Sequence, residues 1–405
     1  MADIPKIRFK GFTDPWEQRK LGEVLKERTE RAKGDEELLS VTIANGVIRQ
    51  IDSEKRNTAS EDRSNYKIVK KGDVPYNSMR MWQGAVGNSK YNGIVSPAYT
   101  ILTPTSEANG KFFMELFKKK STLQIFQRWS QGLTSDTWNL KYPILSSIQF
   151  AIPSVEEQEK IAEYFSSLDH LITLHQRKCD DTKELKKYML QKMFPKNGEK
   201  FPEIRFKGFT EAWEQRKLGE LSSSFEYGLN VAAKEYDGEN KYIRITDIDD
   251  DSREFKQEDI TSPDIDLSSA ENYRLSEGDI LFARTGASVG KSYIYKASDG
   301  LVYYAGFLIR ARIKSEYNAE FVFQNTLTDD YEKFIKVTSM RSGQPGVNAQ
   351  EYSKHQIMVP SKLEQDKISD CFRSLDNLIT LHQRKCDTLK ELKKYMLQNM
   401  FPKKG

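Results

Sequence analysis

The chain has 405 residues, a formal net charge of +4 and 30% charged residues. This length allows two or three domains, and the nearly balanced charge neither proves nucleic-acid binding nor predicts a disordered tail. Three cysteines without a CxxC pair argue against a disulfide framework or a zinc site. The sequence shows no N-terminal apolar signal and no apolar run of about 18 residues, which predicts a cytoplasmic protein that does not enter a membrane.

Two blocks of sequence each occur twice. The entry block, residues 4–23, returns as residues 201–220 with 4 differences in 20 positions. A second block, residues 168–196, returns as residues 375–403 with 4 differences in 29 positions. The segments between these blocks are mostly unrelated. Two copies are too few for a solenoid, so we predict a tandem duplication with pseudo-twofold symmetry, in which a near-constant frame presents two different recognition surfaces.

The first variable region, residues 24–154, has the pattern of mixed α and β structure. A Gly-Asp turn at residues 72–73 leads into strand-like residues, and residues 93–102 read as a further strand. Residues 111–129 have a helical pattern. A polar loop at residues 130–138 then precedes a strand that ends at Pro153.

The second variable region, residues 221–361, repeats this order of elements with different residues. Strands, a helix and a loop are predicted in turn at residues 241–246, 278–283, 303–313, 317–336 and 341–348, before a strand that ends at Pro360. We therefore expect two domains that share a fold and differ in the loops, where function usually resides.

A long helix is predicted after each variable region. Residues spaced alternately by four and three form a heptad seam at Ile161, Phe165, Leu168, Ile172, His175 and Cys179. The seam recurs at a constant offset of 207 as Ile368, Phe372, Leu375, Ile379, His382 and Cys386. A helix over residues 155–193 is about 58 Å long, and Pro195 and Pro402 end the two helices at matching places. The two helices are expected to pack on each other, with the His and Cys positions as a polar layer that sets register rather than as a metal site.

The order of these parts resembles the specificity subunit of type I restriction–modification enzymes. The resemblance covers almost the whole chain. It is carried by three pairs of segments: WEQRKLGE at 16–23 and 213–220, the glycine-bearing turns at 84–87 and 286–290, and the domain exits at 152–161 and 359–368.

The resemblance implies an α+β fold, in which two globular target recognition domains of mixed α and β structure are joined by two long helices that form an antiparallel coiled coil. It implies domains at residues 1–154 and 195–361, the second including the linker and entry block. It also implies a central coiled-coil helix at 155–194 and a C-terminal one at 362–405. Each recognition domain would read one half of a bipartite, asymmetric double-stranded DNA site. The helices would set the gap between the half-sites and dock two methyltransferase subunits.

The implied partners supply the chemistry. Methylation of adenine at N6 with S-adenosylmethionine belongs to the methyltransferase subunits. Two restriction and translocase subunits would cleave unmethylated DNA with ATP and Mg²⁺. The resemblance implies that this chain itself is not an enzyme and holds no cofactor or metal.

Base reading requires polar side chains that reach base edges, since phosphate contacts only position a protein. Arginine suits guanine, and glutamine or asparagine suits adenine. The loop residues of this kind are candidates for DNA contact, with ordinary surface loops as the alternative. They are Arg80, Gln83, Lys90, Gln131, Thr134 and Ser135 in the first domain, and Arg284, Ser288, Lys291, Arg341, Ser342, Gln344 and Asn348 in the second.

Other motifs favour simpler interpretations. Residues 285–292 resemble a phosphate-binding loop, but only three residues separate Gly286 from Gly290 instead of four, so a turn near DNA is favoured. No methyltransferase signature of the Asn/Asp-Pro-Pro-Tyr/Phe type occurs, which argues against a stand-alone methyltransferase. A coiled-coil adaptor without a DNA role is the third alternative. Lysines of the central helix form either a solvated face or a contact to DNA, and they include Lys183, Lys186, Lys187 and Lys192.

Overall fold

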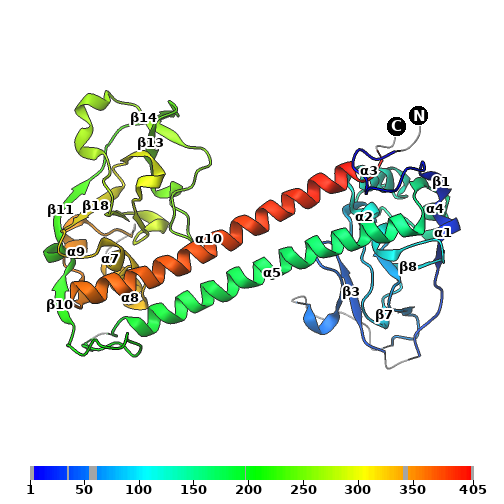
Figure 1. Cartoon of the computed structure of the whole chain (residues 1–405), viewed down its shortest axis with the longest axis horizontal. Helices are drawn as coiled ribbons and strands as arrows, with labels where there is room; N and C mark the ends of the chain where they lie inside the picture. The colour runs from blue at the N-terminus through cyan, green and yellow to red at the C-terminus, as the bar shows by residue number, and fades with distance from the viewer. Residues whose placement is uncertain (1–3, 34–35, 54–61, 197, 341–344, 403–405) are drawn as a thin grey trace. The chain divides into compact units, whose positions relative to one another are not determined.

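The computed structural model describes residues 4–33, 36–53, 62–196, 198–340 and 345–402 (Figure 1). The chain divides into two compact units, one made of Met1–Gln176 with Gln383–Gly405 and the other of Arg177–His382. Both divisions fall inside a long helix, α5 (Val155–Met193) and α10 (Lys362–Asn399). Each unit therefore contains one globular domain and one half of each helix. Within the described residues, no helix is both long enough and apolar enough to cross a membrane.

The first unit contains the N-terminal domain, whose described residues form small antiparallel sheets and three α-helices besides the short α1. Its strands are β1 (Glu17–Lys20), β2 (Leu25–Glu27), β3 (Leu39–Thr42), β4 (Gly46–Arg49), β5 (Lys67–Val69), β6 (Val74–Asn77), β7 (Gly93–Val95), β8 (Tyr99–Pro104) and β9 (Gln149–Ile152). Its helices are α1 (Leu21–Val24), α2 (Gly110–Lys118), α3 (Lys120–Trp129) and α4 (Tyr142–Ser147). The central sheet has the order β2-β8-β6, while β1 pairs with β9, β3 with β4 and β5 with β7.

The second unit contains the C-terminal domain, whose central sheet follows the same plan. Its strands are β10 (Glu214–Lys217), β11 (Ser222–Tyr227), β12 (Ala233–Glu235), β13 (Asn240–Ile243), β14 (Thr261–Pro263), β15 (Asp279–Ala283), β16 (Ser292–Ile294), β17 (Leu301–Tyr304), β18 (Leu308–Ile313) and β19 (Gln356–Val359). Its helices are α6 (Leu218–Leu221), α7 (Ala319–Asn325), α8 (Asp329–Ser339) and α9 (Ala349–Ser353). The order β11-β18-β15 matches β2-β8-β6, and β16 extends the sheet.

Three predicted elements are each split in two. The helix predicted at residues 111–129 breaks at Lys119, whose backbone is extended and whose ammonium group donates to the Pro402 carbonyl at 2.6 Å. The helix predicted at 317–336 breaks before Thr328, whose hydroxyl caps α8 by accepting from the N–H of Tyr331. The strand predicted at 303–313 is interrupted by a turn between β17 and β18, closed by a hydrogen bond from the Leu308 N–H to the Ala305 carbonyl.

The entry block joins its domain to the start of a long helix in the same way in both units. Strand β1 pairs antiparallel with β9, Glu17 opposite Ile152, and β10 pairs with β19 in the equivalent register. Arg8 donates two hydrogen bonds to the carboxylate of Glu157, at 2.6 and 2.7 Å, and the carboxylate side chain is only 1% exposed. Arg205 and Glu364 form the same bidentate pair in the second unit. The repeated sequence thus encodes a repeated junction.

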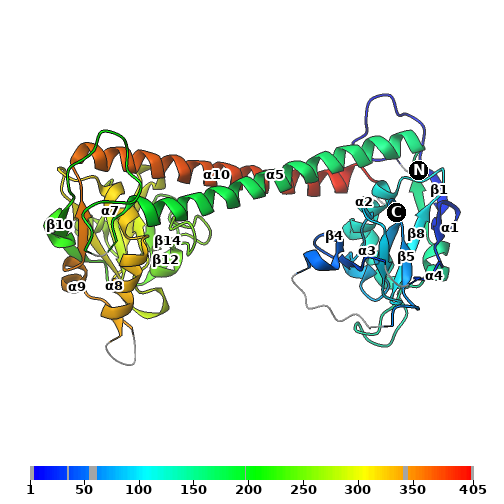
Figure 2. The ribbon, with the colours of Figure 1, turned by 90° about the horizontal axis from the view of Figure 1, so that it is seen from below.

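The two long helices run antiparallel inside each unit. In the first unit, the Cys386 thiol lies 3.9 Å from the Ile172 carbonyl oxygen, and Lys393 pairs with Asp169 at 2.8 Å. In the second unit the matching contacts join Cys179 to Ile379 and Lys186 to Asp376. Figures 1 and 2 show the first half of α5 and the last half of α10 side by side next to α2.

The end of α10 completes the core of the N-terminal domain. Phe401, just beyond the helix, is 1% exposed and packs against Trp16, Phe112 and Phe165. Phe194, beyond the end of α5, occupies the matching place in the C-terminal domain against Trp213, Phe321 and Phe372. Each domain core is therefore closed by the end of one helix and the beginning of the other.

The predicted seam residues are all buried or half-buried, but the first three of each helix, from Ile161 and from Ile368, pack into the core of a globular domain rather than only against the other helix. The buried ones are Ile161, Phe165, Leu168, Cys179, Ile368, Phe372 and Cys386, and the half-buried ones are Ile172, His175, Leu375, Ile379 and His382. Lys186 and Lys192 are engaged in ion pairs with Asp376 and Glu203. These two lysines are thus engaged within the chain, whereas Lys183 and Lys187 are exposed, which fits either a solvated face or contact with DNA.

Candidate nucleic-acid interface

In the C-terminal domain, two loops far apart in sequence meet at the end of β15. The first begins at Arg284, and the second, residues 345–348, precedes α9. The Val347 N–H donates to the Arg284 carbonyl at 2.9 Å, and the Gly286 N–H donates to the Pro345 carbonyl at 3.1 Å. These backbone hydrogen bonds hold the two loops together as one surface.

The Arg284 side chain is held in place by its neighbours. Its guanidinium group lies over the ring of Tyr227, 5.1 Å from the centroid, and Nη1 approaches the Gly306 carbonyl oxygen at 3.5 Å. Its backbone N–H donates to the Phe307 carbonyl at 3.1 Å. Arginine restrained in this way loses less conformational entropy when it forms a bidentate contact. Arg284 is half-buried, so its donors remain partly accessible to a ligand.

The structure adds two aromatic residues to this surface. Tyr227, at the end of β11, is 43% exposed, and Phe307, in the turn between β17 and β18, is 58% exposed. Sequence patterns do not identify them because Tyr227, Arg284 and Phe307 follow or end different strands, and about 80 residues separate Tyr227 from Phe307 along the chain. Phe307 lies inside residues 303–313, which the sequence predicts as one continuous strand, so the sequence gives no signal for the turn that exposes it.

The other candidates of the C-terminal domain lie in different surroundings. Ser288 is half-buried in the turn after Arg284, and Asn348 is exposed with its side-chain oxygen capping α9 through the Glu351 N–H. Lys291 is 7% exposed, and its ammonium group binds Asp250 at 2.5 Å and the Ile248 carbonyl at 3.2 Å. Lys291 does not belong to this surface, because its ammonium group is buried against Asp250 and the Ile248 carbonyl. Arg341, Ser342 and Gln344 lie outside the described residues.

The N-terminal domain brings together the corresponding pair of loops. The Leu140 N–H donates to the Ser78 carbonyl at 2.9 Å, as Val347 does to Arg284 in the other domain. The rings of Trp82 and Trp138 pack edge to face with centroids 5.2 Å apart, which joins the loop after β6 to the loop before α4. Aromatic pairs of this kind stabilise by about 0.5–1.5 kcal/mol beyond burial.

Five of the six candidates of the first domain belong to this pair of loops. Arg80 is exposed and Gln83 is half-buried, and the Arg80 Nη1 approaches the Gln83 side-chain oxygen at 3.5 Å. Gln131, Thr134 and Ser135 are exposed in the second loop. Leu133, at the middle of that loop, is fully exposed and is a further residue that sequence reasoning missed.

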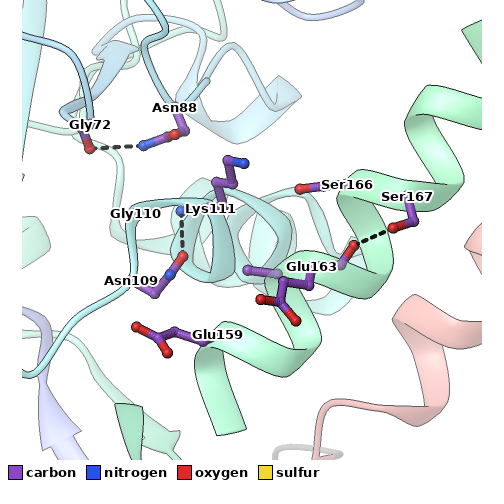
Figure 3. Close-up of a pocket in the computed structure, with 10 residues that line it drawn as sticks. Gly72, Asn88, Asn109, Gly110, Lys111, Glu159, Glu163, Ser166 and Ser167 are labelled. Atoms are coloured by element: carbon purple, nitrogen blue, oxygen red, sulfur yellow. Dashed lines mark hydrogen bonds between the residues drawn. The ribbon is translucent and has the colours of Figure 1, made fainter. Parts of the chain in front are cut away.

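Lys90 lies elsewhere, at the opposite end of β6. The Ser89 N–H next to it donates to the Asp73 carbonyl before the strand begins, whereas Arg80 follows the strand's last residue. A cavity of about 790 Å³ lies near this end, lined by Gly72, Asn88, Asn109, Gly110, Lys111, Glu159, Ala162, Glu163, Ser166 and Ser167 (Figure 3). The carboxylates of Glu159 and Glu163 disfavour phosphate there, since like charges repel. The cavity therefore does not extend the candidate DNA surface.

The long helices carry a second set of exposed apolar side chains, separate from the seam. In the first unit these are Leu171, Leu174, Leu392 and Tyr395, and in the second Leu378, Leu381, Leu185 and Tyr188. Each residue of one helix has its counterpart in the other at the offset of 207. Exposed apolar residues that repeat on both helices suit the docking of two copies of one partner.

Comparisons with known proteins agree on one family. A family model described as the type I restriction modification DNA specificity domain matches residues 13–183 and again residues 210–391. The chain is 23% identical over 343 residues to the type I restriction enzyme MjaVIII specificity subunit of Methanocaldococcus jannaschii, covering 82% of this chain and 78% of that protein.

Two solved structures share the fold. The S subunit of a type I restriction–modification system from M. genitalium matches with a TM-score of 0.64 and 15% identity, covering 99% of this chain and 100% of that one. A chain from a structure of type I restriction–modification complex assembly and conformational transition matches with a TM-score of 0.51 and 15% identity, covering 96% and 99%. These likenesses and the two matched regions confirm the predicted α+β tandem fold.

Proposed function

The chain belongs to the type I restriction–modification DNA specificity family, and from this premise we propose that each unit reads one half of a bipartite DNA site. In this proposal the loops after β6 and before α4 read one half-site, and the loops after β15 and before α9 read the other. The chain would position partner subunits on that site: methyltransferase subunits that methylate adenine at N6, and restriction subunits that cleave unmethylated DNA.

One observation carries the proposal: the two units share the same junction of strands and helix but differ in their loops. The junction of entry strand, exit strand and helix has the same register and the same buried Arg–Glu pair in both units. The paired loops, in contrast, present Arg80 and Gln131 in one domain and Arg284 and Asn348 in the other. Side chains at base edges determine which sequence is bound, so unlike loops on like scaffolds support an asymmetric target.

The helices support a second part of the proposal, the docking of partners. The repeated exposed residues of α5 and α10, Leu171 and Leu378 among them, offer equivalent surfaces to two methyltransferase subunits. Those subunits would bind S-adenosylmethionine, and two restriction subunits would use ATP and Mg²⁺. This chain would contribute recognition and spacing but no catalytic group.

Adenine-methylation sequencing tests the proposal. DNA from cells that express the chain with its methyltransferase partner should carry one bipartite motif with unlike halves. Replacement of residues 221–361 by residues 24–154 should convert that motif into an inverted repeat of the first half-site, because two identical readers then stand on an antiparallel frame. A replaced chain that keeps the original second half-site would refute the assignment of readers to units.

Two further measurements test the alternatives. Methyl transfer by the purified chain alone, incubated with DNA and S-adenosylmethionine, would refute a non-catalytic subunit in favour of a stand-alone methyltransferase. Failure of the complex to bind any DNA sequence preferentially would instead favour the coiled-coil adaptor.

A further inference from the structure

Phe307 stands out in the C-terminal domain as a large apolar side chain that is exposed although its backbone is firmly held. Its neighbours Ala305 and Leu308 are 7% and 0% exposed, whereas Phe307 is 58% exposed. The Gly306 N–H donates to the Leu229 carbonyl at 2.7 Å, and the Leu308 N–H donates to Ala305 at 2.8 Å. The turn is therefore tied into the fold, and only the ring projects outward.

The ring lies beside the best-placed base reader of this domain. The hydrogen bond from the Arg284 N–H to the Phe307 carbonyl places the two residues on adjacent backbone segments. Side chains on adjacent segments stand about 5 Å apart, which is comparable to the rise of about 3.4 Å between neighbouring bases on one DNA strand. Two such side chains can therefore reach the same base pair or its neighbour.

Resting on the proposed function, we propose that Phe307 determines specificity by contacting the C5-methyl group of a thymine next to the base that Arg284 contacts. In the major groove the thymine methyl group is the apolar feature that distinguishes A·T from the other pairs, and Phe is one of the side chains that contact it. The Tyr227 ring is already engaged by the Arg284 guanidinium. Among the described residues around Arg284, Phe307 is the more exposed of the two aromatic side chains, at 58% against 43% for Tyr227.

Thymine-to-uracil substitution tests this contact, since uracil lacks only the methyl group. Once methylation sequencing has identified the half-site of the C-terminal domain, each thymine on either strand is replaced singly by uracil. Binding is then measured with the chain assembled with its methyltransferase partner. The wild-type complex should lose affinity about fourfold at one position, as expected for loss of one buried methyl group.

Variants of Phe307 test whether this loss of affinity on uracil substitution depends on its side chain. F307A should bind the thymine site more weakly and respond no further to uracil at that one position. F307L should keep most of the discrimination, because an apolar side chain remains. L363A, which removes an exposed leucine in the first turn of α10, is the control and should behave as wild type.

Three results would overturn the contact. In the first, the wild-type complex responds to uracil at no thymine of this half-site. In the second, F307A discriminates thymine from uracil at that position as well as wild type does. In the third, F307A binds every variant of the site more weakly by the same factor. The last result would indicate a wedge between bases rather than a methyl contact. Failure of the proposed function is distinguishable, since the wild-type complex would then show no sequence preference on any DNA.

Discussion

Substitution of Phe401 by alanine tests whether the end of α10 belongs to the N-terminal domain. Phe401 is 1% exposed, and its ring centroid lies 5.4 Å from that of Phe112 and 6.1 Å from those of Trp16 and Phe165. Removal of a buried phenylalanine side chain costs about 3–5 kcal/mol through lost burial and the cavity that remains. Domains are stable by only about 5–15 kcal/mol, so F401A should bring the first unit close to unfolding.

Hydrogen exchange resolved by peptide is the assay, because it reports each unit separately. F401A should accelerate exchange in residues 66–104 of the N-terminal domain and leave residues 279–313 protected. The matched variant F194A should do the reverse, since Phe194 closes the core around Trp213.

Y395A serves as the control on the same helix, because Tyr395 is 56% exposed. It should alter exchange in neither segment, as exposed substitutions usually change stability by less than about 0.5 kcal/mol. Loss of protection in residues 279–313 instead of residues 66–104 on F401A would refute the reasoning. It would mean that Phe401 stabilises the C-terminal domain and not the N-terminal one.

Three further predictions concern charge and recognition. Burial lowers the pKa of His355 to about 4, so the contribution of the neutral imidazole to stability is complete above pH 6.5 and is lost as pH falls toward 4. Ile148 occupies the matching position, since its carbonyl accepts from the Leu21 N–H as that of His355 accepts from the Leu218 N–H, and H355I should remove roughly 3 kcal/mol of this acid sensitivity in unfolding titrations. R8A leaves the Glu157 carboxylate buried without its partner and should lower the unfolding free energy of the first unit by about 3–5 kcal/mol, measured by denaturant titration against the exposed-pair control K160A. R284A should lose discrimination by about 1–3 kcal/mol at one base of one half-site in competition binding, whereas uniform weakening on all DNA would identify a phosphate contact.

The sequence by itself determined the repeat, the two long helices, their 4-3 seam and the order of elements in each domain. These features are local: periodicity, prolines and turn residues act within a few residues of one another. The sequence also placed the candidate readers Arg80, Gln131 and Arg284 on loops, because polar residues there interrupt strand and helix patterns.

Only the tertiary structure decided which segments meet. Residues 168–196 and 375–403 differ at 4 of 29 positions, so their sequences cannot tell which helix end closes which core; packing assigns Phe401 to the N-terminal domain and Phe194 to the C-terminal domain. Contacts across long stretches of chain likewise brought Tyr227 and Phe307 to Arg284 and turned Lys291 inward. Such contacts depend on the shape of the folded backbone, which no local pattern records.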